Sequence, residues 1–344
     1  MNSGKVPVNV LKRSVLRQLK NKRTEIANSA GLGADCAVFA PFSKGQMVTC
    51  VQEGVVELQC ENDLAEAERE DLSVMPMRRI FQKCANNLAA AGAEPVAAEL
   101  VIFLPETVEE PELKALMEEA EKAATDLNIQ IIGGQTRVSS AVRQPIATAT
   151  GYGILSEAAV TQVSAGKNLA GQDIIITKWI GLEGTADLAV RNQEGLLTRY
   201  PAYLVEEAAA FDRYYSILPE AATAVKSGGC TMHDASEGGI FAGLWEMAEG
   251  AGVGLTIDMK KLPLRQETVE VCEFCNVNPY ELRSGGSLII ASPEGTAVVE
   301  ALAAEGIPAV IVGRFTDSNE RLILNEDEVR YMDRPQRDEI YKGV

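Results

Sequence analysis

Residues 232–240 have the types and spacing needed for phosphate and metal chemistry. They read Met-His-Asp-Ala-Ser-Glu-Gly-Gly-Ile and lead into an amphipathic pattern that ends in a second glycine-rich stretch. A helix that begins at these glycines exposes backbone N–H groups and a partial positive charge, to which an anion can bind. Gly238 and Gly239 would let the anion come close. The carboxylate of Asp234 could hold the cation that accompanies a nucleotide.

The same segment also fits a purely structural role. Asp234 and Glu237 have the spacing of a capping box, in which both side chains only satisfy free amides at a helix start. His233, the single histidine of the chain, would then be a local hydrogen-bonding residue rather than a general base. Spacing alone leaves both interpretations open.

Length and charge limit the possible classes of protein. A chain of 344 residues is long enough for two domains of ordinary size. A formal net charge of -17 argues against nucleic-acid and anionic-membrane partners, because an acidic surface repels both. No window approaches the roughly 18 apolar residues of a membrane span, and the first residues lack the apolar core of a signal peptide. We therefore expect a cytoplasmic protein with no membrane or nucleic-acid partner, which holds any anionic ligand locally.

The seven cysteines indicate reduced thiols rather than a disulfide framework, because their number is odd and they are scattered. Cys272 and Cys275 have the spacing of half a zinc site or of a redox pair, but no second pair stands near them. We expect both on one helix, with a structural role.

Alternating apolar patterns predict two α/β units. Residues 10–23 are expected to form a basic amphipathic helix, whose charges make a solvated face or a clamp on the acidic body. The first unit is then predicted to have strands at 47–57, 96–104, 129–132 and 144–155, and helices at 72–91 and 111–127. The second is predicted to have strands at 173–177, 253–257, 287–291, 308–315 and 321–324, and helices from 185, around 203–226, at 266–275 and at 294–305. The predicted domains are an N-terminal arm and helix at 1–30, an N-terminal domain at 31–160 and a C-terminal domain at 161–344.

Several segments in order along the chain resemble the superfamily of aminoimidazole-ribonucleotide (AIR) synthases, selenophosphate synthetases, thiamine-phosphate kinases and HypE. The segments are Ser3-Gly-Lys-Val-Pro7, Gly31-Leu-Gly-Ala-Asp-Cys-Ala-Val38, Cys84-Ala-Asn-Asn-Leu-Ala-Ala-Ala-Gly-Ala-Glu-Pro95, Ile131-Ile-Gly-Gly-Gln-Thr136, Thr177-Lys-Trp-Ile-Gly-Leu-Glu-Gly-Thr185, His233-Asp-Ala-Ser-Glu-Gly-Gly239 and Arg283-Ser-Gly-Gly-Ser-Leu-Ile-Ile290. The chain looks most similar to the HypE-like, AIR synthase-related proteins. The resemblance implies an α+β, two-domain PurM-like (AIR synthase) fold. It also implies a homodimer whose N-terminal mixed sheets form a shared barrel, a C-terminal α/β domain, and ATP with magnesium in a cleft.

The resemblance also implies which residues hold the metal. Family members use ATP to phosphorylate an oxygen, often that of a carboxamide, and this needs carboxylates that converge on Mg²⁺. The matching positions here are Asp35, Glu53 and Asp234, with Glu53 standing where the family usually has Thr-Asp. Asn87 replaces an aspartate of the family pattern, and Arg137 replaces a second carboxylate. These losses weaken the case for magnesium and for turnover.

The nucleotide and phosphate contacts implied by the resemblance lie in four parts of the chain. They are Lys5, Asn87, the run Gly133, Gly134, Gln135, Thr136 and Arg137, and the group Lys178, Gly238 and Gly239. The planar fork of Arg137 suits phosphate, although it could instead pair with an acidic side chain. Lys178 either points at phosphate or is simply exposed, as most lysines are.

Two functions are compatible with this pattern. One is an ATP-dependent enzyme of protein maturation that activates a small carboxamide or similar acceptor, alongside a maturation partner protein; its catalytic residues stay unassigned. The alternative is a catalytically degenerate paralogue that acts as a dimeric ligand-binding or assembly protein. Residues 339–344 read Glu-Ile-Tyr-Lys-Gly-Val and lack the tail cysteine of HypE, so that thiol chemistry is not expected.

Overall fold

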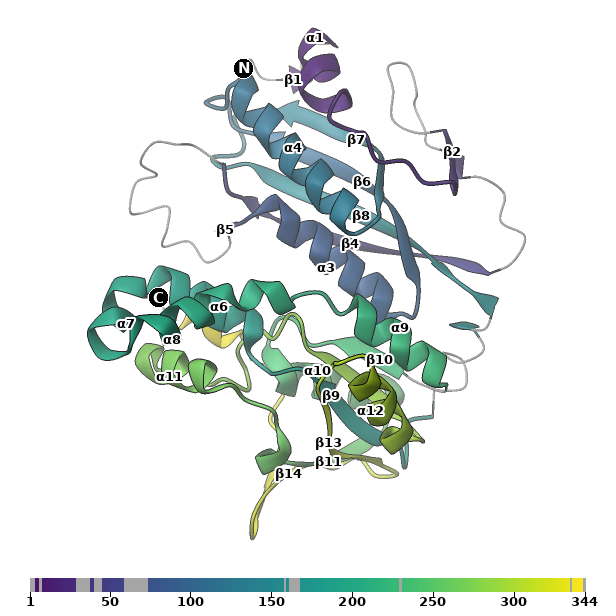
Figure 1. The fold of residues 1–344 in the computed structure, drawn as a ribbon, viewed down its shortest axis with the longest axis vertical. Helices are drawn as coiled ribbons and strands as arrows, with labels where there is room; N and C mark the ends of the chain where they lie inside the picture. Colours follow the sequence, from purple (N-terminus) through teal and green to yellow (C-terminus); the bar gives the residue numbers. More distant parts are fainter. Residues whose placement is uncertain are drawn as a thin grey trace. The chain divides into compact units, whose positions relative to one another are not determined.

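A computed structural model describes residues 4–5, 8–28, 38–39, 45–58, 74–157, 159–160, 168–228, 231–334 and 336–342. The chain divides into two compact units, one of residues 1–88 and 93–157 and one of residues 89–92 and 158–344. Each unit has its own large sheet with helices packed against it (Figure 1). This arrangement confirms the predicted α+β class.

The first unit is built on a mixed six-stranded sheet in the order β1-β7-β6-β8-β4-β5. Its strands are β1 (Gly4–Lys5), β4 (Gln46–Val56), β5 (Val74–Met75), β6 (Glu94–Leu104), β7 (Gln130–Val138) and β8 (Ile146–Leu155). Helices α3 (Met77–Ala90) and α4 (Glu110–Asp126) cover the same face of this sheet (Figure 1). Their apolar sides bury Phe81, Leu113 and Met117 completely or almost completely.

Among the described residues, little of the chain packs on the opposite face of this sheet. Along β4, exposed and less exposed residues alternate, because successive side chains point to opposite faces. Met47, Val51 and Phe103 are large apolar residues that are 47%, 54% and 38% exposed. At one end, the ribbon of β2 (Ile26–Asn28) and β3 (Val38–Phe39) packs the ring of Phe39 edge-on against Tyr152.

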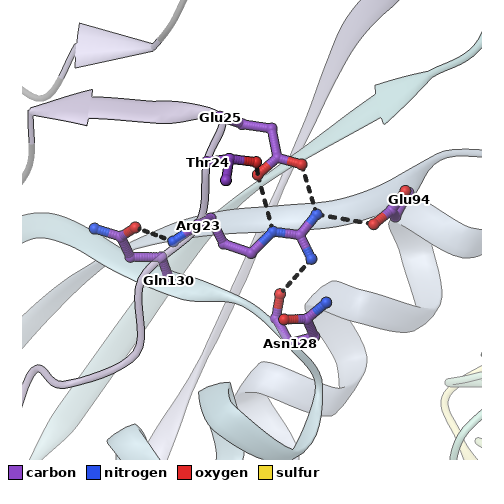
Figure 2. Close-up of polar contacts among 6 residues, drawn as sticks. All are labelled: Arg23, Thr24, Glu25, Glu94, Asn128 and Gln130. Atoms are coloured by element: carbon purple, nitrogen blue, oxygen red, sulfur yellow. Dashed lines mark hydrogen bonds and ion pairs between the residues drawn. The ribbon is translucent and has the colours of Figure 1, made fainter.

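The N-terminal segment is clamped to the first unit by ion pairs. It contains the short helix α1 (Val8–Val10) and the π-helical turn η1 (Leu11–Leu16), in which Arg13 pairs with Glu110 of α4. The Arg23 guanidinium bonds to Glu25 and Glu94, each at 2.8 Å, and its backbone N–H donates to the Gln130 side-chain oxygen (Figure 2). Of the two interpretations of the basic segment, the structure shows the clamp at these two arginines.

Three elements of this unit differ from prediction. The helix expected at 10–23 is wrong beyond Leu16, since the chain continues as an extended strap that is bonded to α4 and β7. The helix expected at 72–91 begins only at Met77, because Pro76 disfavours helical geometry in the residue before it. Val74 instead pairs with Val55 in the parallel β4–β5 ladder. The strand expected at 129–132 extends to Val138.

The second unit contains a seven-stranded sheet in the order β10-β12-β9-β13-β11-β14-β15. Its strands are β9 (Asp173–Thr177), β10 (Thr231–Asp234), β11 (Gly254–Asp258), β12 (Leu288–Ser292), β13 (Ala309–Thr316), β14 (Arg321–Asn325) and β15 (Glu328–Tyr331). Every neighbouring pair is antiparallel except β11 and β14. Strands β10 and β15 were not predicted from the sequence.

Helices cover both faces of this second sheet. They are α6 (Leu182–Arg191), α7 (Gln193–Arg199), α8 (Ala202–Ala209), α9 (Leu218–Ser227), α10 (Gly239–Ala251), α11 (Gln266–Cys275) and α12 (Gly295–Ala304), with short 3-10 turns η2 (Ala210–Tyr214), η3 (Met259–Lys261) and η4 (Glu339–Tyr341). Ile174 and Ile176 pack with α10, whereas Ile175 between them packs with α9 and α12. Burial on both faces therefore explains three consecutive isoleucines in β9. Among the described residues, every helix is too short or too polar to cross a bilayer.

Candidate functional site

Lys178 is the most constrained of the predicted site residues in the second unit. Its ammonium donates to Glu220 Oε1 at 2.7 Å and to the backbone oxygens of Tyr214 and Ser216 at 2.9 and 2.6 Å. Lys178 is 7% exposed and Glu220 is 3% exposed, so the alternative of a simply exposed lysine is wrong. All three ammonium hydrogens are committed, and a phosphate contact would require one of these bonds to break.

The backbone and charge of Lys178 are both unusual. Its φ of 53° places a side chain with a Cβ in the left-handed region, which costs energy in L-residues. Burial lowers the pKa of the ammonium, and the charges of Glu220 and Asp234 oppose this shift. The predicted phosphate contact Lys178 and the predicted metal ligand Asp234 are thus brought within electrostatic reach of each other.

Asp234 lies at the end of β10 and not at a helix start. It faces Leu288 of β12 in the antiparallel ladder, and it is 8% exposed. The helix α10 begins five residues later, with Gly238 as its N-cap, so the capping-box interpretation of Asp234 and Glu237 is wrong. His233 bonds to Glu246 of α10 at 3.0 Å between Nε2 and Oε2, which makes it a local hydrogen-bonding residue.

The start of α10 does carry a carboxylate, but one from the far end of the chain. The Gly238 N–H donates to Asp338 Oδ2 at 2.6 Å, while Asp338 Oδ1 accepts from Ile340 and Arg283 N–H groups at 2.9 and 3.3 Å. Burial raises the pKa of Asp338, and these amides oppose the rise. A carboxylate from near the end of the chain therefore occupies the position where the sequence predicted a bound anion.

Gly239 is required for close backbone packing at the same helix start. Its φ is 70°, and a Cβ there would lie 2.7 Å from the backbone oxygens of Tyr280 and Leu282. The glycine pair thus has a structural reason that is independent of any phosphate.

In the first unit, the run from Gly133 to Arg137 lies along β7. Gly134 has a φ of 140°, and a Cβ on it would approach the Leu100 oxygen to 1.8 Å, so only glycine fits this close crossing. Arg137 is exposed and lies directly opposite Lys5 in the antiparallel β1–β7 pair. The edge of the sheet therefore carries two basic residues at adjacent positions, although the structure describes only the backbone of Lys5.

Glu53 does not meet the residues of β7. The register places Glu53 opposite Thr148, Thr148 opposite Val101, and Val101 opposite Gln135. Three strand spacings separate Glu53 from Gln135, which is roughly 14 Å. Both residues nevertheless occupy the same open face of the sheet.

Glu99 is a residue in this region that was not predicted from the sequence. It lies on β6 beside Gly133, and a Cβ on that glycine would be 3.7 Å from Glu99 Oε1. Tyr152 donates to Glu99 Oε2 at 3.1 Å, and burial, followed by the Glu99 charge, raises the pKa of Tyr152. In the sequence, the one feature that could have indicated Glu99 is its charge inside the otherwise apolar run of residues 96–104.

The remaining predicted residues fall in different settings. Asp35 lies outside the described residues. Asn87 is half-buried on α3, next to Asn86, which accepts a hydrogen bond from Gln82. Cys272 and Cys275 lie on α11 as predicted. Within the described parts of the chain, no three His, Cys, Asp or Glu side chains are grouped to hold a metal ion.

Comparisons with known proteins agree with this architecture. The family model of the AIR synthase related protein, N-terminal domain, matches residues 78–155, and that of its C-terminal domain matches residues 170–325. A carbamoyl dehydratase HypE from Rhodobacter capsulatus is 29% identical over 236 residues, which is 67% of this chain and 66% of that relative. The alignment therefore spans slightly less than two thirds of the relative.

Solved structures show the same fold over nearly the whole chain. A crystal structure of the hydrogenase maturation protein HypE in complex with ATP matches with a TM-score of 0.74 and 18% identity, covering 96% of this chain and 95% of that one. The structure of a HypE-HypF complex matches with a TM-score of 0.67 and 20% identity, covering 86% of this chain and 92% of that one.

Proposed function

The chain belongs to the AIR synthase-related protein family, and from this membership we propose that it is a HypE-like maturation protein. In this proposal it binds ATP and uses it to activate the oxygen of a small carboxamide or a similar acceptor. The observation that carries the proposal is the match of 96% of the chain to the fold of a HypE crystallised with ATP. The similarity to a carbamoyl dehydratase supports the same reaction class.

The basic edge of the first sheet is the part of this chain that we assign to the phosphates. Arg137 is exposed, and among the described residues no acidic side chain forms an ion pair with it. Of the two alternatives for Arg137, this favours a phosphate contact, because a guanidinium can donate two parallel hydrogen bonds to phosphate oxygens. Its backbone is held in place by the ladder with β6 and by the close crossing at Gly134.

A guanidinium at this position would bind the nucleotide and offset charge on a transferring phosphoryl group. The described carboxylates do not fit a magnesium site by themselves. Glu53 is the only carboxylate on β4 and lies roughly 14 Å from Gln135, while Asp234 lies within electrostatic reach of the Lys178 ammonium. We therefore derive no step of the reaction through magnesium.

Calorimetric titration of ATP into the protein, with and without Mg²⁺, tests this proposal. Wild type is expected to bind, and Arg137→Gln is expected to bind at least about tenfold more weakly, since a charge-assisted hydrogen bond contributes about 1.5–3 kcal/mol. Arg143→Gln is the matched control, because Arg143 is another exposed arginine of the same unit. Absence of ATP binding by wild type would refute the proposal. Binding without phosphate release on addition of carboxamides would indicate the degenerate paralogue.

We also propose that a second copy of the chain covers the open face of the first sheet. Met47, Val51 and Phe103 expose apolar surface there, and an exposed apolar sheet face marks an interaction site. Sedimentation at micromolar concentration is expected to show a dimer, and Val51→Glu is expected to shift it toward monomer. A wild-type monomer would contradict the shared-barrel arrangement.

The match to a HypE-HypF complex supports a further proposal, that the chain acts with a maturation partner protein. Mixing the purified chain with a HypF-type protein and measuring co-elution tests it. Separate elution at concentrations of tens of micromolar would contradict it.

A further inference from the structure

Two cysteine side chains of the first unit lie next to the same glycine. Cys50 of β4 lies opposite Gly151 of β8, and its Sγ is 3.4 Å from the backbone oxygen of Cys84 on α3. The Cys84 Sγ lies 3.3 Å from the oxygen of Ala149, also on β8. A Cβ on Gly151 would be 3.4 Å from both Cys50 Sγ and Cys84 Cβ, so both side chains border this one glycine.

The two thiols are also chemically unequal. Cys84 is fully buried, whereas Cys50 is partly exposed. A hydrogen bond from Cys84 lowers the pKa of Cys50, and the same contact, together with burial and the Cys50 charge, raises the pKa of Cys84. Since the thiolate is the reactive, nucleophilic form, Cys50 is the thiol that reacts first with an oxidant.

The chain supplies an internal comparison in the second unit. Cys272 and Cys275 lie on one helix, α11, but burial raises their pKa values to about 12 and about 11. Neither is appreciably ionised near neutral pH, so both are expected to react slowly.

We propose that Cys50 and Cys84 form a reversible disulfide when the protein meets a hydroperoxide. The Cys50 thiolate attacks the O–O bond; an S–O bond forms, the O–O bond breaks, and the departing oxygen takes a proton. The resulting sulfenic acid is neutral, which removes the negative charge that held the Cys84 proton in place. The Cys84 sulfur then attacks the Cys50 sulfur; the S–S bond forms, the S–O bond breaks, and water leaves with the Cys84 proton.

Overall, the two thiols together lose two electrons and one hydroperoxide molecule gains them. When the hydroperoxide is hydrogen peroxide, two water molecules are formed. A dithiol reductant reverses the step. The cross-link would join β4 to α3 through two cysteines that lie 34 residues apart in the sequence.

The test uses the full chain with the cysteines outside the described residues replaced by serine, namely Cys36, Cys60 and Cys230. After exposure to equimolar hydrogen peroxide, non-reducing digestion and mass spectrometry are expected to give a peptide pair joining Cys50 to Cys84. This pair should be lighter by two hydrogen atoms than its reduced components and should be split by dithiothreitol. Cys272 and Cys275 should remain free thiols.

A second variant separates the two roles. In Cys84→Ser the sulfenic acid of Cys50 should persist and be trapped by dimedone, while Cys275→Ser should leave the rate of cross-linking unchanged. Cys50 found only as a free thiol or as sulfinic acid in the protein that retains Cys84 would overturn the proposal. Cross-linking of Cys272 to Cys275 at an equal or faster rate would overturn the assigned chemistry as well.

Discussion

Replacing Lys178 by methionine is expected to destabilise the second unit strongly. The change removes the ammonium but keeps a side chain of similar length, and it leaves the Glu220 carboxylate 3% exposed without the cation that lies 2.7 Å away. It also leaves the backbone oxygens of Tyr214 and Ser216 without their donor. Removing one partner of a buried pair costs more than the pair itself contributes.

The expected magnitude follows from burial and from backbone strain. Breaking a buried ion pair costs about 3–5 kcal/mol. Each kcal/mol lowers the melting temperature of a unit of this size by roughly 2–4 °C, so a fall of roughly 6–20 °C is expected. Lys178→Gly would relieve about 1 kcal/mol of strain at the φ of 53°, but it also removes the packing of a buried side chain, so it should be at least as harmful as Lys178→Met.

Tryptophan fluorescence during urea and thermal unfolding is the assay. The chain has two tryptophans, Trp179 and Trp245, and both lie in the second unit. The control is Lys260→Met, whose partner Glu326 is exposed, so its cost should stay below about 1 kcal/mol. The double variant Lys178→Met/Glu220→Leu should recover most of the loss. A Lys178→Met variant that is no less stable than Lys260→Met would refute the reasoning.

Two further predictions concern the first unit. Hydrogen bonds from Arg13 and Ser14 lower the pKa of Glu110 to about 2, below its unfolded value of 4.5; this contribution to stability is present above pH 4.5 and lost as the pH falls toward 2. In Glu110→Gln, the urea midpoint of unfolding should therefore depend less on pH over that range. The difference should be small because the pair is exposed. A pH dependence equal to that of wild type would contradict this prediction. Gly134→Ala should lower stability by more than about 3 kcal/mol in far-UV circular dichroism melts, because its Cβ meets backbone. As a control in the second unit, Gly250→Ala on α10, with open space around it, should be neutral or stabilising.

Local signals in the sequence were sufficient where one segment determines its own structure. Helix α11 and strand β9 have the predicted bounds, because the first follows one helical period and the second is a short apolar run buried on both faces. The prediction for the N-terminal segment failed because distant residues determine its structure. Its apolar spacing allows a helix to residue 23, but the bonds of Arg23 to Glu94 and Gln130 favour an extended strap. Partners that lie 71 and 107 residues away cannot be seen in a local pattern.

The candidate site also depends on partners that are distant in the sequence. The sequence located a helix start at Gly238 and a lysine at position 178, yet it did not indicate which charges the fold brings to them. A helix N-terminus attracts whichever carboxylate lies within reach, and here that is Asp338, 100 residues away. A buried lysine likewise needs a carboxylate, and Glu220 supplies it. A phosphate that binds the Gly238 amide must therefore displace the Asp338 carboxylate. The open basic edge at Arg137 has no such competitor among the described residues, which is why we place the phosphates there.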